Sequence, residues 1–138
     1  MNYWLFKSEP FKFSWTMLKE KGEAGQEWDG VRNYGARNNM RAMALGDRGF
    51  FYHSNEGLAV VGVLEVSALA HPDSTSGEDG RWECVDVRAL FDMPQPVTLS
   101  AVRANPALAT MALVTQSRLS VQPVTAGEWA EICRMGGL

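Results

Sequence analysis

Apolar positions recur along the chain in short segments, with the period of a strand in some and of a helix in others. Aromatic-rich or alternating segments predict strands, and apolar residues three or four positions apart predict helices. The predicted strands are residues 2–7, 48–54, 58–69, 82–91 and 119–124. The predicted helices are residues 15–21, 35–45, 98–103, 106–113 and 126–135. This order favours a mixed α+β fold with a curled antiparallel sheet or small barrel.

Turn-forming and cap residues set the expected limits of these elements. Residues 55–57 form a tight turn between two strands, which predicts a β-hairpin. Thr125 suits the N-cap of the last helix, because its hydroxyl can accept a bond from a free amide of the first turn. Pro94 and Pro96 are expected to end the fourth strand, since proline lacks a backbone donor. Residues 71–80 are predicted to form an exposed acidic loop.

The segment 35–45 has a clear amphipathic pattern. Its apolar residues recur at helical spacing, which predicts that they face the core: Ala36, Met40, Met43 and Ala44. Arg37 and Arg41 are four residues apart and share a different face, so we expect them at the rim of the helix.

The length of 138 residues, 46% of them hydrophobic and 21% charged, predicts one folded domain over residues 1–138. No apolar run approaches the length of a membrane span, and residues 1–7 do not resemble a secretory signal, so a cytoplasmic location is expected. Cys84 and Cys133 lie far apart without metal-ligand spacing. We expect both to be free thiols in a reducing compartment.

Charge is distributed unevenly, although the formal net charge is only −3. Residues 65–92 hold seven acids and two arginines, a net of −5, whereas residues 30–46 hold three arginines and no acid, a net of +3. The negative total argues against a protein that coats nucleic acid through bulk electrostatics. A local basic patch on an acidic body fits recognition of one nucleotide or a short segment, although a solvated helix face produces the same pattern.

Motifs for catalysis are absent from the sequence. There is no GxSxG, HExxH, phosphate-binding loop or GxGxxG, and two histidines are too few for a His-rich metal site. His53 and Ser54 are neighbours on a predicted strand and point to opposite faces, so His53 is not expected to activate Ser54. Lys7, Ser8 and Glu9 could form a small hydrolytic cluster, but a structural pair or a pocket rim explains Lys7 and Glu9 as well. We therefore predict no catalytic residue, no metal and no cofactor.

Residues 28–41 combine side chains suited to a base and its phosphate. Trp28 offers a stacking face, although a core tryptophan is the alternative. Asn33 and Asn38 present paired donors and acceptors that can read a base edge. Four arginines are candidates for phosphate contacts, the last of which could instead tie the final strand to the core: Arg32, Arg37, Arg41 and Arg118.

Further pocket candidates lie in or beside the predicted strands. Tyr52, His53 and Ser54 end a strand beside a turn, where side chains often line a pocket, although a lone histidine such as His53 is more often a core residue. Trp4 and Trp82 are candidates for a second cage aromatic, although aromatic residues on strands usually belong to the core.

Several motifs, in order along the chain, resemble the EVE domain family. They occupy residues 3–10, 28–33, 36–40, 46–47, 51–54 and 117–121 and so span nearly the whole chain. The resemblance implies a PUA-like fold, a small curled β-barrel with helices around it, related to PUA, ASCH and YTH domains. YTH domains hold a methylated adenine of RNA in an aromatic cage, and EVE domains are thought to be non-catalytic readers of modified bases, in particular modified cytosine in DNA.

Carried over by motif, Trp28 would be a wall of the base pocket, surrounded by Ser8, Asn33, Tyr52, His53 and Ser54. The residues and the resemblance together predict a non-catalytic protein that binds nucleic acid and reads a modified base, in DNA or in RNA, without a membrane or metal partner. Two alternatives stay open. One is a hydrolase of a modified nucleoside or amide that uses Lys7 and Glu9, and the other is a module that binds a small molecule or a protein.

Overall fold

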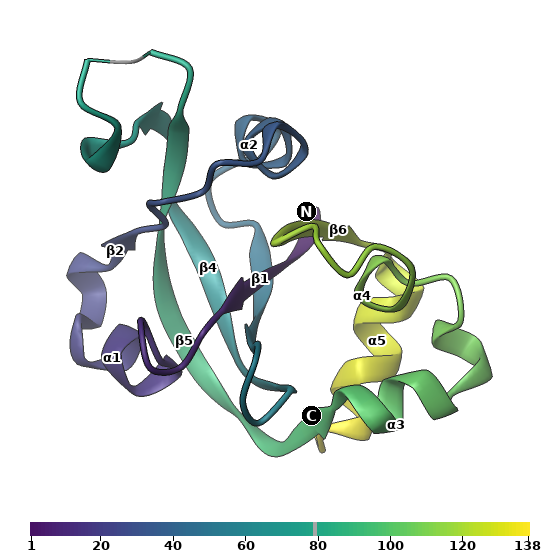
Figure 1. The fold of residues 1–138 in the computed structure, drawn as a ribbon. Helices are drawn as coiled ribbons and strands as arrows, with labels where there is room; N and C mark the ends of the chain where they lie inside the picture. The colour runs from purple at the N-terminus through teal and green to yellow at the C-terminus, as the bar shows by residue number, and fades with distance from the viewer. Residues whose placement is uncertain (79) are drawn as a thin grey trace.

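A mixed six-stranded sheet forms the centre of the computed structural model, which describes residues 1–78 and 80–138 (Figure 1). Its strands are β1 (Tyr3–Ser8), β2 (Gln26–Glu27), β3 (Arg48–His53), β4 (Ala59–Pro72), β5 (Glu83–Thr98) and β6 (Val121–Val124). Their order in the sheet is β2-β5-β4-β3-β1-β6. The sheet is curled but not closed, and among the described strands only the pair β1–β3 is parallel. The α+β prediction is confirmed.

Helices cover both faces of this sheet. The α-helices are α1 (Trp15–Glu20), α2 (Tyr34–Arg41), α3 (Leu99–Ala104), α4 (Ala112–Thr115) and α5 (Ala126–Met135). Three single 3₁₀ turns accompany them: η1 (Gly22–Ala24), η2 (Ser74–Ser76) and η3 (Pro106–Leu108). Figure 1 shows α1 and α2 on one side of the strands and α3, α4 and α5 on the other. Among the described residues, no helix has the length and apolarity needed to cross a membrane.

Two hydrophobic cores lie on the two faces of the sheet. Successive strand side chains point to opposite faces, so β1 and β3 contribute to both cores. Phe6 and Phe51 pack in the core beneath α1 and α2, whereas Leu5 and Phe50 pack in the core beneath α3, α4 and α5. Every strand that separates the two cores is therefore buried on both sides, which explains the continuous apolar runs in the sequence.

The fifth strand continues beyond the point where the sequence predicted its end. β5 runs through Pro94 and Pro96 to Thr98 and keeps its pairing with β4. The register shifts at this point, so that residues 93–96 lie opposite the single Val61. Both prolines sit in this irregular stretch, where regular ladder bonds are interrupted, and so their missing donors break no regular pairing.

Other element limits differ by a few residues. The helix predicted at 35–45 ends at Arg41, and the helix predicted at 106–113 is split between η3 and α4. The last strand begins at Val121, and the short strand β2 directly precedes Trp28, where no strand was predicted. Asp79, an acid of the predicted loop 71–80, lies outside the described residues.

Candidate nucleic-acid interface

A cleft of about 520 Å³ lies between the end of β1, the turn that follows it, and the segment from β2 to Arg32. Ser120, just before β6, closes one side. Pockets that bind small ligands commonly enclose about 300–1,000 Å³. The cleft is therefore large enough for a single base, and it is built mostly from loops that the sheet holds in place.

Trp28 and Phe13 form the aromatic part of the cleft wall. The Trp28 ring is only 6% exposed and meets Phe6, Phe13 and Phe51 nearly edge to face, with ring centroids 5.1, 6.1 and 5.5 Å away. Its backbone amide donates to the Val85 carbonyl at 2.9 Å. Trp28 therefore packs in the core and also lines the cleft. The sequence had offered a core residue and a stacking face as alternatives for it.

Lys7 and Ser8 line the cleft where β1 ends. The Ser8 hydroxyl donates to the Phe13 carbonyl at 2.5 Å and so fixes the turn that carries Phe13. The Lys7 ammonium donates to the Ser117 carbonyl at 2.8 Å. Burial lowers the pKa of Lys7, because a partly desolvated ammonium is less stable than a hydrated one. Lys7 therefore supplies a positive charge beside the cleft that is held in one place.

Acidic and basic side chains are balanced around the cleft. Three carboxylates and three cations line it, and their formal charges cancel: Glu9, Glu27, Asp29, Lys7, Lys12 and Arg32. Burial raises the pKa of Asp29, and the neighbouring Asp73 and Glu27 raise it further. A site without net positive charge is poorly suited to hold a phosphate, whereas its carboxylates can accept bonds from an amino group.

Asp73 holds the loop that contains Arg32. Its buried carboxylate accepts bonds from the Gly30 amide at 2.9 Å, the Arg32 guanidinium at 3.1 Å and the Thr75 amide at 2.8 Å. Burial by itself would raise the pKa of Asp73, but the bonds from Thr75, Gly30 and Arg32 outweigh it and leave the pKa lowered. Arg32 lines the cleft with part of its hydrogen-bonding capacity already used.

Three of the predicted pocket residues at the end of β3 do not line this cleft. Tyr52 is 3% exposed in the core on the opposite face, because it alternates with Phe51 along the strand. The His53 ring accepts a bond at Nε2 from the Trp15 amide at 3.1 Å, and burial lowers its pKa. The Ser54 amide donates to the Ser8 carbonyl at 2.9 Å. The side chains of these residues are therefore not among those that line the cleft, and their place around a base stays a prediction.

The predicted base-reading asparagines and Trp4 also lie away from the cleft. Asn33 is the N-cap of α2, where its side-chain oxygen accepts a bond from the Ala36 amide at 2.8 Å. Asn38 is exposed on α2 and accepts bonds from Arg37. Trp4 is buried, and its indole N–H donates to Asp47 at 3.0 Å. The side chains of Asn33, Asn38 and Trp4 already have these partners within the protein, and their role in a base pocket stays a prediction.

The remaining arginines and Trp82 lie on the surface around α2. The Arg37 guanidinium donates to the Arg81 carbonyl at 2.9 Å, and Arg41 pairs with Glu83 at 2.5 Å. Trp82 stacks on a tyrosine of α2 rather than facing Trp28. Arg118 lines a groove beside the start of α2, and among residues 1–78 and 80–138 it has no hydrogen bond or ion pair. Its role at a phosphate stays a prediction.

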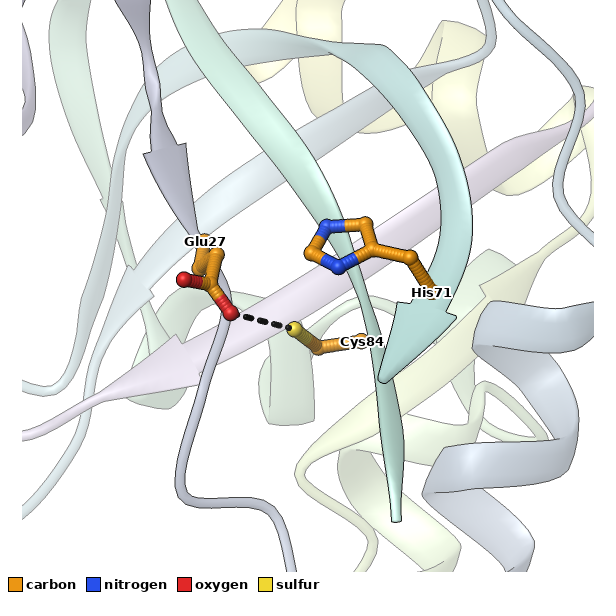
Figure 2. Close-up of side chains that lie close together, drawn as sticks. All are labelled: Glu27, His71 and Cys84. Carbon is orange, nitrogen blue, oxygen red and sulfur yellow. Dashed lines mark hydrogen bonds between the residues drawn. The ribbon is translucent and has the colours of Figure 1, made fainter. Parts of the chain in front are cut away.

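Three side chains with metal-ligand chemistry meet on β2, β4 and β5, and Figure 2 shows Glu27, His71 and Cys84 pointing toward one another. Their ligand atoms lie within 4.8 Å of one another. The ligands of a tetrahedral zinc ion stand about 3.5 Å apart, which is the separation of the Cys84 sulfur and the Glu27 carboxylate oxygen. The Cys84 thiol donates to Glu27 at 3.5 Å, and burial, followed by that contact, raises its pKa far above the ordinary range.

His71 is also bonded within the protein, through Nε2 to Asp86 at 2.7 Å. In the arrangement described, protein groups therefore bond to one another in this cluster, and metal binding would require these bonds to be replaced and the thiol to lose its proton. The sequence did not reveal the cluster because its members stand 44 and 13 positions apart on separate strands.

Sequence reasoning missed several residues that line the cleft. Phe13, Val31 and Ser120 are among them, and Asp29 was treated only as part of a turn. Phe13 could have been predicted as a cleft residue from the sequence, because it is an aromatic residue in a polar turn directly after a predicted strand. Ser120 could not have been predicted in this way, because its place beside Lys7 depends on the pairing of β6 with β1.

Comparison with known proteins finds a family model described as EVE domain that matches residues 2–135. Thymocyte nuclear protein 1 of Mus musculus is 39% identical over 159 aligned residues, which cover 93% of this chain and 70% of that protein. A crystal structure of a protein from Agrobacterium tumefaciens is 70% identical, with a TM-score of 0.99 over 100% of this chain and 94% of the other.

Two further solved structures contain nucleic acid. Human THYN1 in complex with DNA that contains 5-methylcytosine is 32% identical, with a TM-score of 0.93 over 100% of this chain and 99% of the other. The YTH domain of Zygosaccharomyces rouxii MRB1, in complex with N6-methyladenosine RNA, is 17% identical, with a TM-score of 0.59 over 98% and 86% of the two chains. The second likeness concerns the fold alone, and both agree with a PUA-like fold.

Proposed function

The chain belongs to the EVE domain family, and on that premise we propose that it is a non-catalytic reader of a modified base in nucleic acid. The observation that carries the proposal is the cleft beside Trp28, in which an aromatic wall meets acceptor groups without a net positive charge. The 5-methylcytosine DNA bound by human THYN1, a relative of nearly the same fold, supports the choice of ligand.

In the proposed complex, the base leaves its stack and enters the cleft while its phosphates stay outside. Trp28 and Phe13 contact the base, and stacking on an aromatic side chain contributes about 1–3 kcal/mol. The carboxylates of Glu9 and Asp29 are placed to accept bonds from an exocyclic amino group, which is how acidic side chains read cytosine. The cleft therefore favours cytosine or adenine over thymine or uracil.

A methyl group on the base adds apolar surface in the same cleft. Val31 is partly buried and packs against the core that contains Trp28, so a methyl group that reaches it leaves water. Burial of a single methyl or methylene group is worth about 0.8 kcal/mol. We therefore expect a preference for the methylated base of about fourfold, in addition to the stacking common to both.

Three oligonucleotides that differ in one base separate the contribution of the amino group from that of the methyl group. A labelled single strand with a central 5-methylcytosine should bind more tightly than the same strand with cytosine, as measured by fluorescence anisotropy. The strand with thymine carries the methyl group but lacks the amino group, and it should bind less tightly than 5-methylcytosine. Equal binding of all three strands would contradict a base reader, and binding to none would end the proposal.

A matched pair of tryptophan variants tests the position of the base. Trp28 and Trp15 are buried to a similar degree in the same core, but only Trp28 lines the cleft. Trp28→Leu should weaken 5-methylcytosine binding about tenfold or more, because leucine keeps apolar volume but offers no aromatic face. Trp15→Leu should lower the melting temperature and leave the affinity of the folded protein unchanged. The reverse pattern would place the base elsewhere.

A second candidate, hydrolysis of a modified nucleoside, rests on Lys7 and Glu9 lining the same cleft and on the lowered pKa of Lys7. Against it, Lys7 bonds to the Ser117 carbonyl and Glu9 pairs with Lys12 at 3.4 Å. Incubation of the protein with modified nucleosides, followed by chromatography, decides between the two functions. Turnover that disappears in Lys7→Met would favour the enzyme.

A further inference from the structure

Tyr34 and Trp82 form an exposed aromatic stack outside the cleft. Tyr34 begins α2 and Trp82 directly precedes β5, yet their ring centroids lie 4.9 Å apart with 22° between the ring planes. Neither ring belongs to the two hydrophobic cores. Tyr34 is 51% exposed whereas Trp82 is partly buried, so Tyr34 is the member of the pair that solvent reaches more freely.

Two guanidinium groups lie close to the stack. The central carbon of Arg37 lies 4.8 Å from the Tyr34 ring centroid, and that of Arg32 lies 5.5 Å from the Trp82 ring centroid. Arg37 is held in place by its bond to the Arg81 carbonyl. Aromatic rings next to arginines are the combination that binds unpaired nucleotides, because the rings stack on bases and the cations attract phosphates.

The stack is connected to the cleft on two sides. Arg32 lines the cleft and also lies over Trp82. The loop that ends at Ser120 forms the second connection, because Ser117 accepts the bond from Lys7 in the cleft and Arg118 lines the groove beside Gly35, the neighbour of Tyr34. Arg118 is exposed and unpaired among the described residues, and it lines the groove beside the start of α2.

We propose that Tyr34 binds, by stacking, the base next to the one held in the cleft, and that Arg118 meets the phosphate between them. The occupant is the adjacent nucleotide of a single-stranded or locally opened nucleic acid, and any base can fill the position because every base has a stacking face. This inference rests on the proposed function. It makes the binding site two nucleotides long, with one base read and one base only stacked.

A purely structural role for the stack makes a different prediction. Tyr34 and Trp82 would then only fasten α2 to the segment before β5, and loss of the tyrosine ring would lower stability without changing the affinity of the folded protein. The two roles are separated by ligands of different length. A nucleoside fills the cleft alone, whereas a trinucleotide reaches the stack as well.

The experiment compares 5-methyl-2′-deoxycytidine with a trinucleotide that carries the same base at its centre, in NMR titrations of ¹⁵N-labelled protein. Tyr34→Ala should weaken trinucleotide binding about tenfold and leave nucleoside binding unchanged. Tyr34→Phe keeps the ring and should bind as the wild type does. Phe91→Ala is the matched control, since Phe91 is an exposed aromatic residue near Arg48 that lines neither the cleft nor the groove.

Each other outcome has a distinct meaning. Unchanged trinucleotide affinity in a folded Tyr34→Ala overturns the stacking site and leaves the cleft intact. Equal losses for nucleoside and trinucleotide place Tyr34 in the cleft instead and also overturn it. If Tyr34→Ala converts a dimer to a monomer in sedimentation, the face is an interface between two copies. If wild-type protein binds neither ligand, the proposed function fails, and the stacking site fails with it.

Discussion

Trp28 is held in one orientation by the rings around it. Phe6, Phe13 and Phe51 approach it nearly edge to face, and Phe13 is itself held by the bond from the Ser8 hydroxyl to its carbonyl. A base that enters the cleft therefore meets a wall that is already formed. Little side-chain entropy is lost on binding to such a wall, which favours affinity without additional contacts.

His53 should make stability depend on pH through its bond with the Trp15 amide. Burial lowers the pKa of His53 below its usual value of 6.5, so the unfolded chain binds the proton more readily than the folded protein does. The stabilising contribution of neutral His53 is therefore complete above pH 6.5 and decreases as the pH falls below it. His53→Gln keeps an acceptor for the Trp15 amide but does not titrate.

We expect the stability advantage of the wild type over His53→Gln to shrink between about pH 7.5 and about pH 5.5, measured by urea unfolding. The difference between the two proteins is the useful quantity, because His71 has a raised pKa and shifts stability in the opposite direction in both. An advantage that stays constant over this range would show that His53 has the same pKa in the folded and unfolded states, and it would contradict the prediction.

Short elements and turns shape the cleft more than the long strands do. β2 has only two residues, and its pairing with β5 places Trp28 at the wall. Asp73, which caps the turn η2, holds the loop that follows β2 by accepting bonds from Gly30 and Arg32. The long strands β4 and β5 supply a rigid support on which these short pieces are fixed.

Asn33 should act as a helix cap and not as a base reader. Asn33→Ala should lower the free energy of unfolding by about 1 kcal/mol, because the Ala36 amide loses its acceptor. Asn33→Ser can still cap and should restore most of that loss. Thermal unfolding of the three proteins checks the order. A changed preference for 5-methylcytosine over cytosine in either variant would return Asn33 to the list of base-reading residues.

Close packing between β4 and α1 depends on Gly62. A Cβ atom at this position would lie 2.2 Å from the Trp15 ring, so Gly62→Ala must displace the ring or the strand and should cost about 1–3 kcal/mol. Gly127→Ala, in the open first turn of α5, should be neutral or stabilising by up to about 1 kcal/mol. Chemical unfolding of both variants measures the contrast, and equal effects would contradict this packing argument.

The two faces of the sheet differ in what covers them. One face of the sheet carries α3, α4 and α5 over a closed core, and the other carries α1, α2 and the cleft (Figure 1). If the proposed function holds, the net charge of −3 means that unpaired cations near the cleft, and not the overall field, attract the nucleic acid. Affinity should therefore depend on few phosphate contacts.

Arg118→Gln should lower the salt dependence of binding to single-stranded oligonucleotides. Loss of one phosphate contact reduces the slope of log affinity against log salt concentration by about 0.7. Arg103→Gln, on α3, removes the same charge at a position that lines neither the cleft nor the groove beside α2, and its slope should equal that of the wild type. Anisotropy titrations at several salt concentrations give the slopes. Equal slopes for Arg118→Gln and the wild type would remove Arg118 from the interface.

Local patterns in the sequence determined most of the secondary structure. Aromatic-rich segments predicted β1 and β3, and a run that is apolar on both faces predicted most of β4 as a buried strand. The N-cap residue Thr125 and the apolar stripe of Ala36 and Met40 predicted α5 and α2, since these signals act within a few residues. The prediction that Pro94 and Pro96 end the strand was wrong, because a bulge in the pairing of β5 with β4 accommodates both prolines.

The resemblance of the sequence to EVE domains led to the family and the general fold, and the residues themselves placed Trp28 at the centre of interest. Only the tertiary structure decided which side chains join Trp28. It brought Phe13, Asp29 and Ser120 to the cleft and turned Tyr52 to the opposite face. The physical reason is that a cleft forms where distant segments meet, and strand register and the curl of the sheet decide that meeting. A sequence pattern, in contrast, reports only on neighbours a few positions away.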